Sequence, residues 1–385
     1  MDYKRILRII VIVLIIAGIG AGAYFLWMWL GSKTVANLPG TGQAPTTEVV
    51  NVGEGGAIGA QINTSEQTTT QAPQTVTQKL SIFIDTPVSE YWLNSKDNSV
   101  YFANLAGQII KINSNGTRQL ASSQTLNNLH SIMPSADGSL AIAEFNYPEL
   151  PTFSIFSASS TSWQPLPAGA ISAAASPDSQ KIAYTNKNSL NILDLTTQKT
   201  SKAQDLSQVG LNIDWITGQN ILLTSESAVD SRGYVYSFDL TTKILKTLVS
   251  GEYGVDINWA NDGALGIKLN STDRVPKLSL IDNFGSNVVN FAFLTVPEKC
   301  LLLSQKVYCG IPKNIRQGII LPDDYYTKND YFVDDIFEMD LPTRKITKIF
   351  DGNNVALDAY DLKLKDNNLL FINRYDNKVY SLALQ

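Results

Sequence analysis

A motif repeats along most of this 385-residue chain with a period close to 40 residues. Each copy has a short apolar segment, a polar turn and a second strand-like segment, as in "IMPSADGSLAIAEF". The first apolar residues after the turns are Val100, Leu140, Ile182, Ile221, Leu265, Val307 and Leu369. They lie 39 to 44 residues apart, except for a last interval of 62. This period, made of short strands without a helical pattern, predicts an all-β fold, a seven-bladed β-propeller with four-stranded blades.

A third strand follows in each copy, for example "YVYSFDL", which alternates apolar and polar residues as packed strands do. The seventh copy stops after its third strand, at Gln385. The strand-like segment "KLSIFID", residues 79–85, precedes the first copy. We expect this N-terminal strand to complete the last blade, because closing the ring removes open sheet edges that promote aggregation. The propeller is therefore predicted to span residues 79–385.

One copy, "SPDSQKIAYTN...LNILDLTTQK" within residues 171–200, resembles the repeat of the TolB-like and dipeptidyl-peptidase-type propellers, which are WD-repeat-like. Blades of that family carry Ser-Pro-Asp-Gly, an Ile-Ala-Tyr-like strand and a later Asp-Leu-Thr-Thr-Gly-like turn. Ser179 stands here where the family usually has glycine. The repeat length matches that of the family over residues 79–385, and the motif residues match clearly in this one copy. It implies the fold much more than a function.

The amino terminus carries an unbroken apolar run, residues 9–30, which is long enough to cross a bilayer as a helix. Three basic residues precede this run, so the positive-inside bias predicts a cytoplasmic tail, residues 1–8, and an exported carboxyl-terminal part. The alternative is a signal peptide cleaved near "AGA", residues 21–23, but the apolar run continues beyond it. We expect a single-pass protein of the cytoplasmic membrane, with its C-terminal domain in a bacterial cell envelope.

Residues 31–78 are rich in Gly, Pro, Thr and Gln and have no apolar periodicity, which predicts a disordered linker. A flexible chain of this length has a reach on the order of 40 Å. The formal net charge is -5, and the basic residues form no run. This pattern argues against a nucleic-acid partner.

The chain has only two cysteines, Cys300 and Cys309, in "CLLLSQKVYC". A two-residue turn at Ser304 and Gln305 would place them directly opposite each other on two paired strands. The Cα atoms of such a pair lie about 4.5 Å apart, at the near edge of disulfide geometry. The expected exported location also permits the bond. Two buried free thiols are the alternative.

The sequence contains no recognisable catalytic constellation, and we expect no enzyme, no metal and no cofactor. One histidine, His130, cannot build a triad or a His-rich metal site, and no phosphate-binding loop is present. Carboxylates cluster in residues 321–335, where they could hold Ca²⁺, although solvated loops have the same composition. The alternative is a glycan-cleaving or lyase enzyme, whose carboxylates would have to converge in the central channel. A mainly structural or sensory module is a further alternative.

Several connections between second and third strands are long, above all residues 313–332, whereas those between first and second strands are short. Long loops of this kind leave a propeller on one face, and loops on a rigid scaffold usually carry its function. We expect this face to bind an envelope protein or a wall component. The candidate contact residues are Tyr147, Asp323, Asp324, Tyr325, Tyr326, Tyr331 and Phe332. The alternative is that the loops only cover the packing of the blades.

Overall fold

The computed structural model divides the chain into two units, and the residues that it describes lie in the second, Pro73–Gln385. It describes residues 80–384, with gaps at 125, 149, 226–227 and 354. No helix in these described ranges is long and apolar enough to span a membrane.

Three predicted segments lie outside the described residues. They are the cytoplasmic tail at residues 1–8, the transmembrane helix at residues 9–30 and the linker at residues 31–78.

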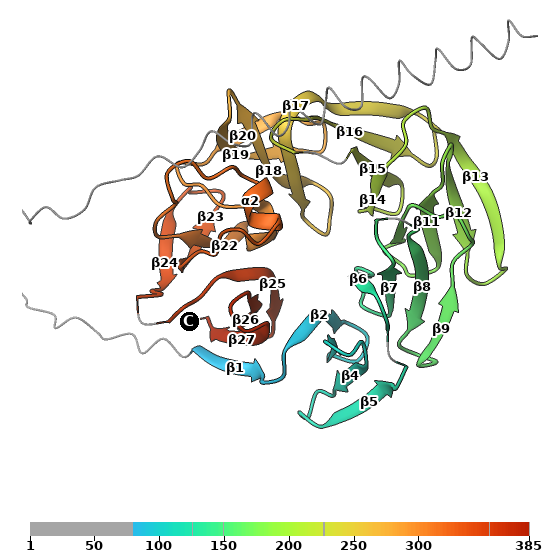
Figure 1. Ribbon diagram of the computed structural model, residues 1–385, viewed down its shortest axis with the longest axis horizontal. Helices are drawn as coiled ribbons and strands as arrows, with labels where there is room; N and C mark the ends of the chain where they lie inside the picture. Colours follow the sequence, from blue (N-terminus) through green and yellow to red (C-terminus); the bar gives the residue numbers. More distant parts are fainter. Residues whose placement is uncertain (1–79, 125, 149, 226–227, 354, 385) are drawn as a thin grey trace, which may run out of the picture. The chain divides into compact units, whose positions relative to one another are not determined.

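The described part of the second unit is an all-β fold of antiparallel sheets, and Figure 1 shows these sheets arranged around a ring. Five sheets have four strands and one has seven. The first sheet contains β2 (Val88–Asn94), β3 (Ser99–Asn104), β4 (Ile109–Ile112) and β5 (Arg118–Ser122). The second contains β6 (Leu129–Pro134), β7 (Leu140–Phe145), β8 (Thr152–Ser157) and β9 (Ser162–Pro165). The third contains β10 (Ser172–Ala175), β11 (Lys181–Thr185), β12 (Ser189–Asp194) and β13 (Lys199–Asp205).

The remaining sheets follow the same antiparallel order. The seven-stranded sheet contains β14 (Leu211–Trp215), β15 (Asn220–Ser225), β16 (Arg232–Asp239), β17 (Leu245–Trp259), β18 (Leu265–Thr272), β19 (Val275–Asp282) and β20 (Asn287–Asn290). Next come the 3-10 helix η1 (Pro297–Lys299), β21 (Cys300–Leu302), β22 (Lys306–Pro312), the short helix α2 (Asp323–Tyr326), β23 (Asp334–Asp340) and β24 (Ile346–Phe350). The last sheet holds β25 (Ala359–Lys365), β26 (Asn368–Asn373), β27 (Lys378–Ala383) and β1 (Leu80–Ile84).

The first strand of the described chain completes the last sheet. β1 pairs antiparallel with β27, and Leu80 lies opposite Leu382. The prediction that residues 79–85 supply this strand is therefore confirmed by the pairing. Both ends of the described chain are joined in one sheet, so β27 has no open edge.

Aspartate carboxylates cap the turn between the first and second strands in several blades. In the second sheet the Asp137 carboxylate accepts the backbone N–H of Ser139 at 2.9 Å. Gly138 between them has φ of 69°, and a Cβ there would lie 1.9 Å from the carbonyl oxygen of Leu93. The turn needs glycine at this position, both for the left-handed backbone and for the close approach of the neighbouring sheet.

The core lies between neighbouring sheets. Trp92 of β2 stacks on Tyr101 of β3 at 5.5 Å between ring centroids, and Phe156 of β8 meets both rings edge-on. The Trp92 indole N–H also donates to the carbonyl oxygen of Gly138 at 3.2 Å. Large aromatic side chains therefore join the first and second sheets by packing and by a hydrogen bond.

The cysteine hairpin has the predicted register. Cys300 of β21 lies opposite Cys309 of β22, and Leu303 donates its N–H to the carbonyl oxygen of Lys306 at 2.8 Å across the two-residue turn. A disulfide joins the two sulfur atoms, with a Cα separation of 4.1 Å. The predicted pairing is confirmed, and no free cysteine is left in the described chain.

Candidate functional site

The first strands of the sheets line a cavity of about 700 Å³, which we call the channel cavity. Residues of β2, β17, η1, β21 and β25 form its wall. In Figure 1 the strands β2, β6, β14 and β25 lie nearest the centre of the ring. An adjoining cavity of about 240 Å³ shares Trp259 and Asn258 with it and is lined by β10 and β14 as well.

Four carboxylates and one lysine give the channel cavity its charge. The only lysine or arginine in its lining is Lys363, which lies 3.5 Å from Glu90 and also forms an ion pair with Asp361. The other two carboxylates are Asp256 and Glu298. One cation therefore faces four acidic groups, so the wall carries an excess of negative charge.

The pKa values of these carboxyls are raised. Burial raises the pKa of Glu298 to about 7, and the charge of Asp256 adds to the effect. Burial also raises the pKa of Asp256 to about 6, although a hydrogen bond from Tyr326 opposes the rise. The pKa of Glu90 lies well above its usual range because of burial and then of Asp361. Glu90 keeps 20% of its side-chain surface exposed, so water in the channel moderates this rise.

Buried hydrogen-bond donors without a partner lie beside these acidic groups. Within the described residues, the indole N–H groups of Trp215 and Trp259 make no hydrogen bond, and both side chains line the adjoining cavity. Trp215 is 7% exposed. The Tyr325 hydroxyl lies close to Glu298 and opposes the rise of its pKa. Buried donors of this kind are normally hydrogen-bonded to protein groups or to ordered water.

The connection at residues 313–332, which we call the insertion, reaches the channel cavity through α2. The Tyr326 hydroxyl donates to the Asp256 carboxylate at 2.7 Å, and its side chain lines the cavity. Tyr326 is 44% exposed. One predicted contact residue therefore lies at the acidic site.

Two other predicted contact residues are not on the surface. Tyr325 is 1% exposed and Phe332 is 3% exposed, and both belong to the apolar core around β18 and β22. Their rings stack at 5.7 Å, and the Arg374 guanidinium lies 3.9 Å from the Tyr325 ring. The prediction that these two side chains face a partner was wrong, because the insertion folds its aromatic residues inward onto the sheets.

The remaining predicted residues are scattered. Asp323 accepts the N–H of Val229 at 3.1 Å, and Asp324 accepts the N–H of Ile320 at 2.8 Å, so both hold loops in place. Tyr331 is half-exposed. Tyr147, also half-exposed, stacks on His130 at 4.2 Å and lines a different cavity. The binding role assigned to these residues stays a prediction.

The acidic residues of the channel were missed by the sequence reasoning, but a signal existed. Several first strands carry an acidic residue shortly before an aromatic one, as in "SEYW", "IDW" and "VDINW". Asp214 in the second of these segments is exposed and lines the adjoining cavity. An acidic residue recurring on first strands indicates that acidic groups meet where those strands converge.

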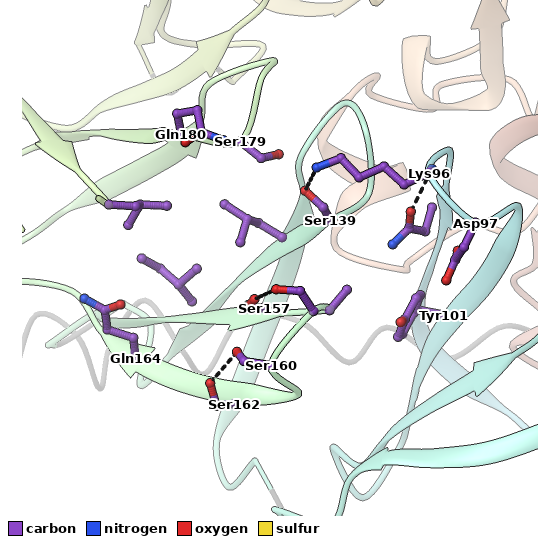
Figure 2. Close-up of a pocket in the computed structure, with 16 residues that line it drawn as sticks. Lys96, Asp97, Tyr101, Ser139, Ser157, Ser160, Ser162, Gln164, Ser179 and Gln180 are labelled. Carbon is purple, nitrogen blue, oxygen red and sulfur yellow. Dashed lines mark hydrogen bonds between the residues drawn. The ribbon is translucent and has the colours of Figure 1, made fainter. Parts of the chain in front are cut away.

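A serine-rich cavity of about 480 Å³ lies between the first three sheets (Figure 2). Its polar groups bind one another: Ser160 and Ser162 are 2.7 Å apart, and Lys96 donates to Ser139 at 3.2 Å. Its hydroxyls therefore have partners already. In the described ranges no group of three or more His, Cys, Asp or Glu side chains could hold a metal ion.

No protein-family profile matches this chain, and no curated protein matches it in sequence. Solved structures do match its fold. Oligogalacturonate lyase from Vibrio parahaemolyticus has a TM-score of 0.56 at 10% identity, over 81% of this chain and 95% of that one. The β-propeller domain of Cps50 from Myceliophthora thermophila has a TM-score of 0.52 at 9% identity, over 80% of this chain and all of that one.

The tricorn protease matches with a TM-score of 0.53 at 11% identity, over 80% of this chain but only 34% of the protease chain. Because identities are this low, the likenesses show the fold alone. The described domain is a β-propeller.

Proposed function

We propose that this chain is a membrane-anchored, extracytoplasmic β-propeller that binds a positively charged segment of an envelope protein in its channel cavity. The anchor is the apolar run at residues 9–30, and the export is inferred from the basic residues before it. The TolB-like character rests on the repeat at residues 171–200. The same chemistry would recognise the amino groups of a wall component.

The proposed ring has seven blades. Five blades are the four-stranded sheets, and the seven-stranded sheet divides into two at β17. That strand is 15 residues long; its first part, up to Tyr253, pairs with β16, and its second part, Tyr253–Trp259, pairs with β18. It thus serves as the outer strand of one blade and the inner strand of the next. Five and two make seven, as the repeat predicts.

The channel chemistry carries the proposal. Four carboxyl groups, of which Glu90, Asp256 and Glu298 have raised pKa values, face one lysine, so a bound ammonium or guanidinium group would relieve their mutual repulsion. The unpartnered indole N–H groups beside them can donate to carbonyl oxygens. A peptide with basic side chains supplies both the cations and the carbonyl acceptors. An acidic cavity also attracts such a ligand over a distance, which speeds its association.

Photo-crosslinking in the cell envelope tests this proposal. A benzoyl-phenylalanine at Tyr360, an aromatic residue lining the channel cavity, should capture a protein through a segment rich in Lys or Arg. The same photoreactive residue at Ser160, in the serine-rich cavity, is the matched control. Capture of wall material instead of protein would show that the ligand is a wall component. Equal capture at both positions, or capture through an acidic segment, would contradict the proposal.

A second candidate function is glycan cleavage at the same cavity. A carboxyl with a pKa of about 7, Glu298, near Asp256 has the properties of a general acid beside a second carboxyl. The likeness to oligogalacturonate lyase does not transfer its substrate, because an acidic cavity repels a sugar acid. A neutral or amino-sugar oligosaccharide is the better candidate. Its cleavage by the wild-type protein, with loss in Glu298→Gln, would establish this function.

A further inference from the structure

A lysine is completely enclosed in the protein between two aspartates. Lys299 ends η1, and its Nζ lies 2.7 Å from an oxygen of Asp334 and 2.5 Å from an oxygen of Asp358. All three side chains are 0% exposed. Isolated charges buried this deeply are strongly unfavourable, so each of them needs an opposite charge or a hydrogen bond close by.

The two aspartates have different surroundings. Asp358 also pairs with the Arg374 guanidinium at 3.0 Å and accepts the N–H of Phe332 at 3.0 Å. Asp334 has no second cation within salt-bridge distance in the described chain, and it accepts the N–H of Ala359 at 2.8 Å. The negative charge of Asp334 is therefore less well compensated by cations than that of Asp358.

Aromatic rings seal the lysine from water. The Phe332 ring centroid lies 4.7 Å from Nζ of Lys299, and that of Tyr325 lies 5.6 Å away. Water would compete with an amine for a carboxyl carbon and would hydrolyse an activated intermediate. A nucleophile, a carboxyl group and a second carboxyl group held in a dry site satisfy the requirements for condensation.

We propose that Lys299 and Asp334 condense into an intramolecular amide bond, with Asp358 as the group that transfers the proton. A proton first passes from the Lys299 ammonium to the Asp334 carboxylate, giving an amine and a carboxylic acid. Nζ then attacks Cγ of Asp334 while Asp358 accepts one of the two protons on the attacking nitrogen, and the other stays on the nitrogen as the amide N–H. Asp358 returns that proton to the departing hydroxyl. One C–N bond forms, one C–O bond breaks and one water molecule leaves, with no oxidant or reductant.

The protonation of Asp334 agrees with this sequence of steps. Burial raises its pKa to about 6, although the charge of Lys299 opposes the rise. The carboxylic acid is a better electrophile than the carboxylate. The resulting bond would join η1 to β23 and close the chain around the insertion. It would act together with the disulfide, whose first cysteine follows Lys299 directly.

Mass spectrometry of the purified, folded full chain tests the proposal. After correction for the disulfide, the wild-type mass should be lower than that of the sequence by one water molecule. Trypsin should fail to cut after Lys299 and should release one branched peptide containing residues 299 and 334. Lys268 and Glu252 form an ion pair at 2.7 Å that is partly exposed, so their peptides should stay separate. This pair is the matched control for proximity alone.

Two variants test the role of Lys299 as the amine and the role of Asp358 as the proton acceptor. Lys299→Arg keeps the charge but removes the amine, so its mass should match its sequence. Asp358→Asn keeps both reacting groups but removes the proton acceptor, so the linked fraction should fall at least tenfold. A linked fraction that Asp358→Asn leaves unchanged would overturn the role of Asp358. A wild-type mass equal to that of the sequence, with an ordinary cut after Lys299, would overturn the proposal itself.

Discussion

At the scale of single residues, Asp137 shows how the repeat is joined to itself. Its carboxylate caps its own turn and forms an ion pair with Lys96 of the preceding sheet at 2.9 Å. It also accepts the hydroxyl of Ser179 from the following sheet at 2.5 Å. Ser179 occupies the turn position where the resembling family has glycine, with φ of 58°. The serine costs some backbone strain but adds a bond between sheets that glycine cannot make.

We predict that Asp137→Asn lowers the free energy of unfolding by about 2 kcal/mol, because hydrogen bonds to a charged acceptor are lost. Burial tends to raise the pKa of Asp137, but hydrogen bonds from Ser179, Ser139 and Lys96 hold it well below its usual range. A lowered folded-state pKa stabilises the fold above the unfolded value, so the contribution disappears as the pH falls into the acidic range.

Urea unfolding of both proteins at pH 7 and at pH 3 measures this effect. Asp282→Asn, in an exposed turn capped by its own carboxylate, is the control and should cost less. A difference between Asp137→Asn and wild type that does not shrink at pH 3 would contradict the assigned role.

At the scale of structural elements, the sequence predicted strands well and the insertion poorly. The strand pattern has a period of two and a turn residue at each end. The sequence therefore predicted the register of the cysteine hairpin, in which Cys300 lies opposite Cys309. The insertion at residues 313–332 has no period. Its tyrosines looked like surface residues because the sequence does not tell which side of a loop faces the core. Tyr325 lies within the core and Tyr331 does not.

This difference gives a prediction for the two tyrosines. Tyr325→Ser should lower the free energy of unfolding by about 3–5 kcal/mol, because it removes a buried aromatic side chain. Tyr331→Ser should change it by less than about 1 kcal/mol, since substitutions at exposed positions are usually small. Thermal and urea unfolding of each variant provide the test. Equal losses for both would show that the insertion is packed differently.

At the scale of the whole molecule, the repeat period sufficed to predict the β-propeller and the strand that completes its last sheet. It could not predict the channel site. Glu90, Asp256, Glu298 and Asp361 are separated by many residues in sequence, and only the ring of first strands brings them to one cavity. Burial in that cavity is the main cause of the raised pKa values of Glu90, Asp256 and Glu298, and neighbouring carboxylates add to it. A carboxylate site formed by distant strands is a property of the closed fold.

The most direct test of the central claim is a binding titration with charge-matched peptides. A fluorescently labelled oligolysine peptide should bind the full chain at pH 8, and an oligoglutamate peptide of the same length should not. Binding should weaken as the pH falls through about 7, because Glu298 becomes protonated there. The Asp256→Asn and Glu298→Gln double variant should bind at least tenfold more weakly, while Asp205→Asn, at an exposed position of β13, should bind like wild type. Equal affinity for both peptides, or no effect of the double variant, would contradict the claim.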